Sequence, residues 1–520
     1  MRSSGETRWL WRFAVFTALL TTLPYLVAFA RAGTEWEFTG FLLAVDDGNS
    51  YIAKMLSGTH GAWTFRTPYT TYPQGGLFGL FLPYLLLGKL AGGVELHLQL
   101  VALFHLFRIA GVLVYVFAVY DFLAVFTERV SARRLGTVLA AFGGGVGWLL
   151  VLAGQGNLFG DLPLDFYSPE AFGFLGLFVL PHLAVGRALI LWGFAVLLGR
   201  EPGSGLWTGL RAGLLWLAAG LFNPLAPAIA LLVSGLYVLL LVVRPGGAER
   251  PGVVRNFGAA AMLALPPVIF NAGATLLDPF FREWSAQNTI LSPHPLHYLA
   301  AYAIYLPWAY RGARRLLAGG GLPGRLPVIW VLAVPIMVYL PVNLQRRLAE
   351  GVFVALLALF VVGLDAVAVR GRPPRHLVPL GVAAVLTTLL LLAGAGRTAW
   401  YPAEPAFRPA AETEAFGYLA EAAPPGSVVL APVPVGNALP AFAPVRVVIG
   451  HGPESIGFER LRPQVEAFFE GRLTGPEAVG LLVEQGVDYV FWPGAVVPPA
   501  PGLEPLYVNG EVTIFEYRPP

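Results

Sequence analysis

Long apolar runs alternate with short arginine-bearing segments through about the first 400 residues of the chain. Each run approaches the roughly 20 apolar residues that cross a bilayer as one helix. We therefore predict an α-helical polytopic membrane protein with eleven spans. The predicted spans are 10–30, 98–121, 135–153, 180–199, 206–222, 225–243, 256–274, 298–312, 327–342, 351–369 and 377–394.

The first run, Leu10 to Ala30, contains no charged residue other than Arg12 and follows Arg2 and Arg8. Basic residues before an apolar segment favour a cytoplasmic N-terminus. A cleavable signal peptide is the alternative, because residues 28–30 have a small-x-small pattern. We predict a membrane anchor, since the run is longer than a usual signal core and rich in aromatic residues.

Arginine placement orients the other spans, because short arginine-rich loops stay in the cytoplasm. All five basic clusters are cytoplasmic only if the apolar segment Gly76–Leu90 does not cross. That segment is short and flanked by Pro73 and Gly92, so we predict a juxtamembrane helix in the outer leaflet. The clusters are Arg129/Arg133/Arg134, Arg200/Arg211, Arg244/Arg250/Arg255, Arg311/Arg314/Arg315/Arg325 and Arg370/Arg372/Arg375.

The pattern changes after Arg397, where prolines punctuate a hydrophilic region. Short β-type runs at 427–431, 446–449, 488–492 and 512–517 alternate with helical runs at 410–421, 459–470 and 476–485. Alternation of this kind predicts a small α/β domain with a mostly parallel sheet. We therefore divide the chain into a transmembrane domain, 1–396, whose first outer loop is 32–97, and an extracytoplasmic domain, 397–520.

Composition agrees with a membrane protein. The chain is 56% hydrophobic and 12% charged, with mean hydropathy +0.66, which excludes a soluble globular protein of this length. It has no cysteine, so disulfides, thiol nucleophiles and cysteine-ligated zinc are excluded. Residues 1–396 hold 27 basic and 17 acidic residues, whereas 397–520 hold 7 and 14, so the two regions lie in different surroundings. We expect a multi-pass protein of the cell membrane.

An acid pair, Asp46 and Asp47, opens the first outer loop between apolar flanks. Carboxylates are costly to keep beside a membrane, so we expect one of them to be functional. The alternative is helix N-capping, which we expect of the other acid.

The remaining polar candidates lie in later loops and spans. Asp165 and Glu170 follow the third span, where a capped helix starting at Ser168-Pro169 is the alternative role. Arg346 and Arg347 are paired on the outer side against the usual bias, which indicates either phosphate binding or snorkelling toward headgroups. Arg108 and Arg187 lie within spans, where they line a cavity or pair with buried acids.

The layout of the first 400 residues resembles that of the GT-C-type integral membrane glycosyltransferases. The resemblance rests on the acid pair, the Tyr-x-x-x-x-x-x-Gly spacing of Tyr51 and Gly58, the Pro-Gln-Gly turn 73–75, the juxtamembrane helix and the acids of the second outer loop. This group includes oligosaccharyltransferase catalytic subunits, protein O-mannosyltransferases and aminoarabinose transferases. The chain lacks a Trp-Trp-Asp signature, which argues against asparagine-linked transfer.

The resemblance implies an inverting transfer of a sugar from a polyprenyl-phosphate or -diphosphate carrier to a lipid, glycan or protein acceptor outside the cytoplasm. It makes Asp46 or Asp47 the catalytic base. Asp47, Asp165 and Glu170 would hold Mg²⁺ or Mn²⁺ if a metal is used, whereas Arg346, Arg347 and Arg108 would bind the carrier phosphate. Further substrate contacts are expected from Tyr51, Lys54, Arg66, His182 and His451.

Two other functions fit the same pattern. One is a transporter or flippase of a lipid-linked glycan, although we see no internal repeat. The other is a non-catalytic membrane scaffold whose outer domain binds a partner. In each case we expect contacts with membrane lipids and none with nucleic acid.

Overall fold

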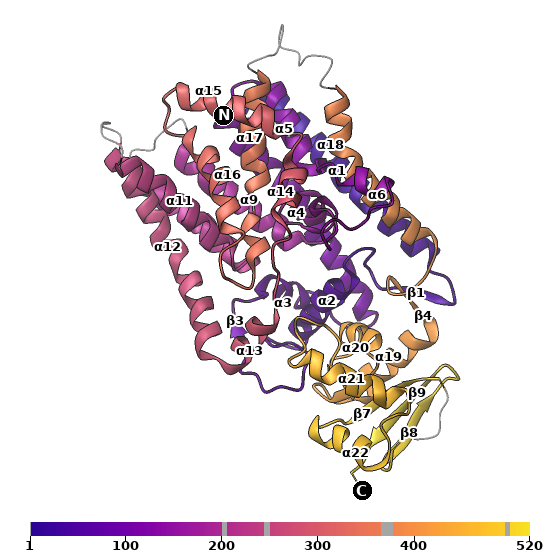
Figure 1. Cartoon of the computed structure of the whole chain (residues 1–520). Helices are drawn as coiled ribbons and strands as arrows, with labels where there is room; N and C mark the ends of the chain where they lie inside the picture. The colour runs from indigo at the N-terminus through magenta and orange to yellow at the C-terminus, as the bar shows by residue number, and fades with distance from the viewer. Residues whose placement is uncertain (1, 200–204, 244–249, 366–377, 495–499, 520) are drawn as a thin grey trace. The chain divides into compact units, whose positions relative to one another are not determined.

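The computed structural model describes residues 2–199, 205–243, 250–365, 378–494 and 500–519 (Figure 1). Helices dominate the chain up to residue 400, and strands gather in the last 120 residues. Up to residue 200 the elements are α1 (Ser4–Arg31), β1 (Trp36–Phe38), α2 (Val45–Thr59), β2 (Thr64–Phe65), β3 (Leu77–Phe78), α3 (Leu82–Gly88), α4 (Leu96–Ala124), α5 (Val130–Phe142), α6 (Gly147–Leu152), α7 (Leu164–Tyr167), α8 (Phe174–Phe178) and α9 (Pro181–Leu198).

The middle of the chain continues as α10 (Leu206–Phe222), α11 (Ala226–Val243), α12 (Arg250–Leu277), α13 (Pro279–Gln287), α14 (Pro295–Tyr302), α15 (Leu306–Ala318), α16 (Arg325–Met337), η1 (Gln345–Ala349), α17 (Val352–Asp365) and α18 (Val378–Trp400). The C-terminal elements are β4 (Phe407–Pro409), α19 (Ala410–Ala422), β5 (Val428–Leu430), α20 (Val433–Ala438), η3 (Leu439–Ala441), β6 (Arg446–Val447), α21 (Phe458–Phe469), α22 (Gly475–Glu484), β7 (Tyr489–Pro493), β8 (Leu503–Val508) and β9 (Val512–Tyr517).

Seven helices among the described residues are long and apolar enough to cross a membrane: α1, α4, α9, α11, α12, α17 with the preceding η1, and α18. The apolar helices α10 and α16 are shorter. These nine elements coincide with nine of the eleven predicted spans. The chain is thus a multi-pass membrane protein, and most of its spans follow from apolar run length.

The two remaining predicted spans are each interrupted. Span 135–153 consists of α5 and α6, separated at residues 143–146. The break packs closely, because a Cβ added at Gly145 would lie 2.7 Å from the carbonyl oxygen of Ala301. Span 298–312 is divided between α14 and α15, and Pro307 stands in the first turn of α15, where its missing N–H costs no helical hydrogen bond.

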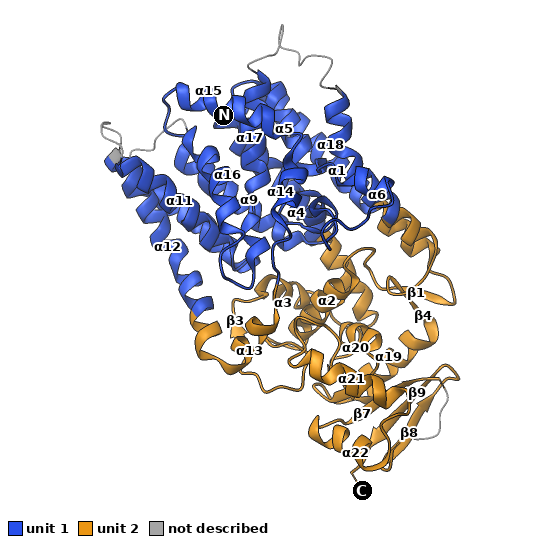
Figure 2. Ribbon diagram, viewed as in Figure 1, with its two compact units in different colours: residues 1–22, 107–272, 290–394 blue, residues 23–106, 273–289, 395–520 orange. Residues whose placement is uncertain are grey.

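Chain contacts group the described residues into two compact units (Figure 2). Unit 1 comprises residues 1–22, 107–272 and 290–394, and unit 2 comprises 23–106, 273–289 and 395–520. In unit 1, α17 is buried along nearly its whole length and packs against α5, α15 and α16. This buried helix fixes the position of the turn η1, which immediately precedes it.

In unit 2, α2 packs against α3 at a crossing that requires glycine on both helices. A Cβ added at Gly58 would lie 2.1 Å from the carbonyl oxygen of Leu85, and one at Gly88 would lie 1.8 Å from that of Met55. The spacing of Tyr51 and Gly58 thus serves helix packing. The predicted helix Gly76–Leu90 is wrong in its bounds, because β3 occupies its start and α3 covers only Leu82–Gly88. Helix α3 rises about 10 Å, one third of the hydrocarbon thickness, so it is too short to cross the bilayer.

The C-terminal sheet has the order β6-β5-β7-β9-β8. Strands β6, β5 and β7 are parallel, whereas β9 runs antiparallel to β7 and β8. The prediction of a mostly parallel sheet is therefore wrong, because it omitted β8, which forms an antiparallel pair with β9. A separate two-stranded pair joins β1 to β4, with Glu37 opposite Arg408.

Several residues used for orientation lie outside the described ranges. These are Arg200, Arg244, Arg370, Arg372 and Arg375, together with the end of predicted span 351–369 and the first residue of span 377–394. The cytoplasmic N-terminus and the extracytoplasmic C-terminal region stay predictions.

Candidate functional site

The acid pair lies in the first turn of α2. The helix begins after Ala44, which has a left-handed backbone (φ 49°) and no side-chain capping bond. The expectation that one acid caps this helix is therefore wrong. Asp46 and Asp47 instead place negative charge near the free amides of the helix start, which the helix dipole favours. Asp46 is exposed and Asp47 is half-exposed.

His451 faces this turn from the loop that follows β6. Its Nε2 lies 3.3 Å from Oδ1 of Asp47. Partial desolvation raises the pKa of Asp46, and although His451 and Arg408 oppose the rise, the charge of Asp47 adds to it. The structure thus brings Asp46, Asp47 and His451 together. The carboxylate of Asp46 is more basic than that of an ordinary aspartate.

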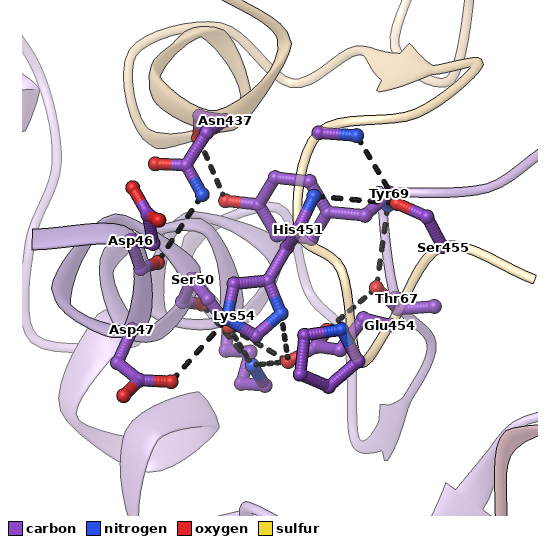
Figure 3. Close-up of polar contacts among 12 residues, drawn as sticks. Asp46, Asp47, Ser50, Lys54, Thr67, Tyr69, Asn437, His451, Glu454 and Ser455 are labelled. Carbon is purple, nitrogen blue, oxygen red and sulfur yellow. Dashed lines mark hydrogen bonds and ion pairs between the residues drawn. The ribbon is translucent and has the colours of Figure 1, made fainter. Parts of the chain in front are cut away.

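Behind this surface lies a buried polar network around Lys54 (Figure 3). Lys54 Nζ lies 2.6 Å from Glu454 Oε1 and also donates to Ser50. Ser50 Oγ donates to Glu454 Oε1 at 2.7 Å, and Thr67 Oγ1 donates to Glu454 Oε2 at 2.6 Å. The Lys54 ammonium also lies 4.4 Å from the centre of the Phe81 ring, a cation–π arrangement.

The charges of this network are matched. Burial lowers the pKa of Lys54, while Glu454 acts in the opposite direction. Burial alone raises the pKa of Glu454, but the charges of Lys54 and then His451 outweigh it and hold the pKa below its ordinary value. Glu454 is therefore ionised beside Lys54. This pairing anchors the 450–455 loop to α2 and thereby fixes His451 beside Asp47.

Asn437 makes a second connection to α2. Its Nδ2 donates to the carbonyl oxygen of Asp46 at 3.3 Å, and its Oδ1 accepts from Asn49 at 2.8 Å. Sequence patterns identified neither Asn437 nor Glu454. One signal was available for Glu454, because a lysine on a helix with an apolar flank needs a buried acid as its partner.

A second candidate cluster lies in unit 1. Glu170 is 4% exposed and faces two guanidinium groups, with its oxygens 3.9 Å from Arg346 Nε and 3.7 Å from Arg347 Nε. Arg346 also lies over the ring of Tyr167, 4.6 Å from its centre. Within the described part of the chain, neither Nε–H has a hydrogen-bond acceptor. The cluster therefore has two cations, one anion and two buried donors without acceptors, an arrangement suited to a phosphate.

The segment around Glu170 is a turn, so no helix starts at Ser168-Pro169. Asp165, in α7, is 4% exposed and has its own partners. Its Oδ2 accepts from Thr387 at 2.5 Å and from the amides of Gly145 and Gly147 at 3.0 and 3.2 Å. Burial raises its pKa against these hydrogen bonds. In the structure Asp165 braces the break between α5 and α6.

The buried arginines differ in their partners. Arg187 pairs with Glu350, so of the two roles considered for it the paired one is confirmed. Arg108 donates to the hydroxyls of Thr21 and Thr22 at 2.9 and 2.7 Å. A role for Arg108 in carrier binding stays a prediction.

The other predicted contacts have varied surroundings. Tyr51 is buried and stacks on Tyr84, with ring centres 4.6 Å apart. Arg66 is exposed and donates to the carbonyl oxygen of Gly75 at 3.2 Å. His182 is half-buried at the start of α9. Their contacts with substrate stay predictions, as does that of the buried Lys54.

The donor sets do not fit a cation held within either unit. No three His, Cys, Asp or Glu side chains come together as a metal site in the ranges that the structure describes. Glu170 faces two guanidinium groups, and one oxygen of Asp165 is engaged by three donors. Ligation by Asp47, Asp165 and Glu170 stays a prediction, and no step below depends on a metal.

No protein-family model matches the sequence, and no curated protein matches it significantly. Solved structures do match it. The apo oligosaccharyltransferase of Archaeoglobus fulgidus superposes with TM-score 0.58 and 13% identity, over 94% of this chain and 70% of that one. The arabinofuranosyltransferase AftD from Mycobacteria gives TM-score 0.52 and 15% identity, over 96% and 40%.

A third match covers nearly the whole of both chains. ArnT from Cupriavidus metallidurans, bound to undecaprenyl phosphate, gives TM-score 0.51 and 13% identity, over 97% of each chain. At these identities the likeness establishes the fold, and it agrees with the resemblance inferred from the sequence. This polytopic membrane protein has the GT-C fold of integral membrane glycosyltransferases.

Proposed function

We propose that this protein is a membrane glycosyltransferase that moves a sugar from a polyprenyl-phosphate or -diphosphate carrier to an acceptor on the extracytoplasmic side. The observation that carries the proposal is the acid pair at the start of α2 in a chain of GT-C fold. Two proteins of this fold were solved with such carriers: AglB with a dolichol-phosphate and ArnT with undecaprenyl phosphate.

The reaction needs a base at the acceptor. The acceptor hydroxyl attacks the anomeric carbon, the bond from that carbon to the carrier phosphate oxygen breaks, and configuration inverts. We assign the base to Asp46, because its carboxylate is exposed and partial desolvation raises its pKa above that of an ordinary aspartate. Asp47, next to it and held by His451, supplies the second negative charge of the pair.

The reaction also needs positive charge at the leaving group. The departing phosphate gains one negative charge as the anomeric bond breaks. Arg346 and Arg347 suit this task, since their Nε–H donors lack acceptors in the described part of the chain and guanidinium groups bind phosphate in a bidentate manner.

The test is transfer by the purified protein in nanodiscs, with a panel of polyprenyl-phosphate and -diphosphate sugars and mass-spectrometric detection. We expect sugar to move from at least one carrier to an acceptor, and transfer to cease in an Asp46→Asn/Asp47→Asn variant. A parallel reaction with EDTA tests metal dependence, because one Archaeoglobus fulgidus enzyme structure holds zinc and sulfate. Absence of transfer with every carrier would overturn the proposal in favour of the flippase or scaffold alternatives.

A further inference from the structure

Arg187, on α9 of unit 1, is a fully engaged buried cation. Its side chain is 2% exposed, and its Nε pairs with Glu350, which is 0% exposed. Its other two nitrogens donate to backbone carbonyls: Nη1 to Phe172 at 3.2 Å and Nη2 to Pro169 at 2.5 Å. One planar group thus holds three fixed points of the chain in three directions.

The three points lie in the two segments that carry Glu170, Arg346 and Arg347, which we call the phosphate cluster. Pro169 and Phe172 flank Glu170 in the sequence. Glu350 ends the turn that carries Arg346 and Arg347, and its amide donates to the carbonyl oxygen of Arg347 at 3.2 Å. The guanidinium of Arg187 is therefore a physical connection between the acid and the two cations of the cluster.

The spacing within the cluster depends on this connection. Glu170 is 3.9 and 3.7 Å from the two Nε atoms, which is outside hydrogen-bond range. Attraction between the Glu170 carboxylate and the two guanidinium groups would shorten these distances if the two segments could approach each other. Because the Arg187 guanidinium fixes both segments, the two Nε–H donors remain without an acceptor among the described residues and open to an anion.

We propose that Arg187 is the positioning residue of the carrier-phosphate site: it holds Arg346 and Arg347 apart from Glu170 so that their donors remain available to phosphate. The inference rests on the proposed function for the identity of the anion. The positioning role itself can be tested independently of that function, since it predicts the affinity of the site for an anion whether or not sugar is transferred.

The sharpest variant is Arg187→Lys. An ammonium keeps the charge opposite Glu350 but cannot also reach both carbonyls in the geometry of a planar guanidinium. Misplacement by about 1 Å can cost on the order of a hundredfold in a positioned site. We expect the KM for the lipid-linked donor to rise about tenfold or more and kcat to fall as well, with the acceptor KM unchanged. Glu350→Asp, which keeps the charge but shortens the side chain, should have the same effect.

The chain offers a closely matched control in Arg133. It too binds one carboxylate and two carbonyls: Glu6 at 2.8 Å, Thr127 at 2.8 Å and Glu128 at 3.0 Å. Arg133 is in the same unit, and none of these three partners belongs to the cluster of Glu170, Arg346 and Arg347. Arg133→Lys should leave the donor KM unchanged.

Binding separates failure of this inference from failure of the proposed function. Undecaprenyl phosphate is titrated into the full-length protein in nanodiscs, with the wild type and all three variants compared. Support requires a Kd about tenfold weaker in Arg187→Lys and Glu350→Asp but not in Arg133→Lys. Unchanged affinity in Arg187→Lys would overturn the positioning role even if the wild type transfers sugar. An absence of transfer together with the predicted Kd pattern would overturn the proposed glycosyltransferase activity and support the phosphate site positioned by Arg187.

Discussion

The imidazole Nε2 of His451 lies 3.3 Å from Oδ1 of Asp47, although 404 positions separate the two residues. The histidine is 6% exposed, whereas nearly half of the Asp47 side chain is open to solvent. The contact joins the start of α2 to the loop after β6 and leaves one face of the carboxylate accessible. The C-terminal sheet region thus contributes directly to the surroundings of the acid pair.

Neutralising the acids should stop the chemistry and spare carrier binding. We expect Asp46→Asn to lower turnover by about a hundredfold to ten-thousandfold, the usual contribution of a general base. Asp47→Asn should also abolish most turnover, and the Kd for undecaprenyl phosphate should stay close to that of the wild type. The control is Glu477→Gln, because Glu477 is an exposed acid in the first turn of α22 in the same unit. Wild-type rates in both aspartate variants would exclude this pair as the catalytic site.

Removing either guanidinium of the phosphate cluster should affect binding and rate together. Arg346→Ala or Arg347→Ala deletes a charged donor to the leaving group, a loss that costs roughly 3 kcal/mol by analogy with oxyanion donors. Both the Kd for undecaprenyl phosphate and the rate constant of a single turnover measure the effect. Arg311→Ala, an exposed arginine stacked on Trp308, is the control. If both cluster variants bound the carrier normally, snorkelling toward lipid headgroups would be the better explanation of this pair.

The buried pair of Lys54 and Glu454 should dominate the stability of its surroundings. Glu454→Gln leaves an uncompensated ammonium in the interior, which costs on the order of 3–5 kcal/mol. We expect a clear fall in the apparent melting temperature of the purified protein. The surface pair of Arg518 and Glu516 is the comparison, and Glu516→Gln should change stability by less than about 1 kcal/mol. Combining Lys54→Met with Glu454→Gln should recover much of the loss; an equally unstable double variant would show that charge pairing is not the cause.

The same pair predicts a pH dependence. The pKa of Glu454 in the folded protein lies below its ordinary value of 4.5, so the folded state holds the proton less tightly than the unfolded state. The stabilisation is therefore complete above pH 4.5 and is lost as pH falls through the lowered pKa. The gap in melting temperature between wild type and Glu454→Gln should be constant from pH 7 to about 5 and shrink in stronger acid. A gap that widens in acid would contradict this assignment of charge.

Orientation can be measured directly in a chain without cysteine. Gly92 is exposed, and a Cβ there has no neighbour within 4 Å, so Gly92→Cys should be tolerated. We expect an impermeant thiol reagent to label it from outside intact cells, and reporter fusions after Arg129 and Trp400 to report opposite sides. Labelling that needs permeabilised cells, or fusions on the same side, would refute the predicted topology.

The parts of the fold that follow from run length were predictable, as α1 and α4 show. Interruptions were not, because the break at residues 143–146 depends on contacts with Ala384 and Ala301 from distant segments. Strand β8 also escaped prediction, since it contains Pro505 and pairs only with β9 at the sheet edge.

Some residues of the candidate site were likewise predictable from the sequence, and others were not. Polar residues against an apolar background identified the acid pair and the outer arginines, since membrane surroundings make such residues costly. Glu454 and Glu350 were missed, because each was an ordinary loop acid until its partner, Lys54 or Arg187, was known. A buried ion pair is a property of two positions, and no local pattern encodes the second.

The pairing of β1 with β4 has a consequence for synthesis. Thr39 donates to the carbonyl oxygen of Ala406, which is translated 367 residues later. At about 5–20 residues per second, the ribosome needs roughly 20–70 s to cover that interval. During this time β1 has no partner strand and α2 lacks the loop that supplies His451. A nascent chain that stalls before Phe407 therefore leaves its first segment unfinished as well, and holdase chaperones should recognise that segment rather than the missing end.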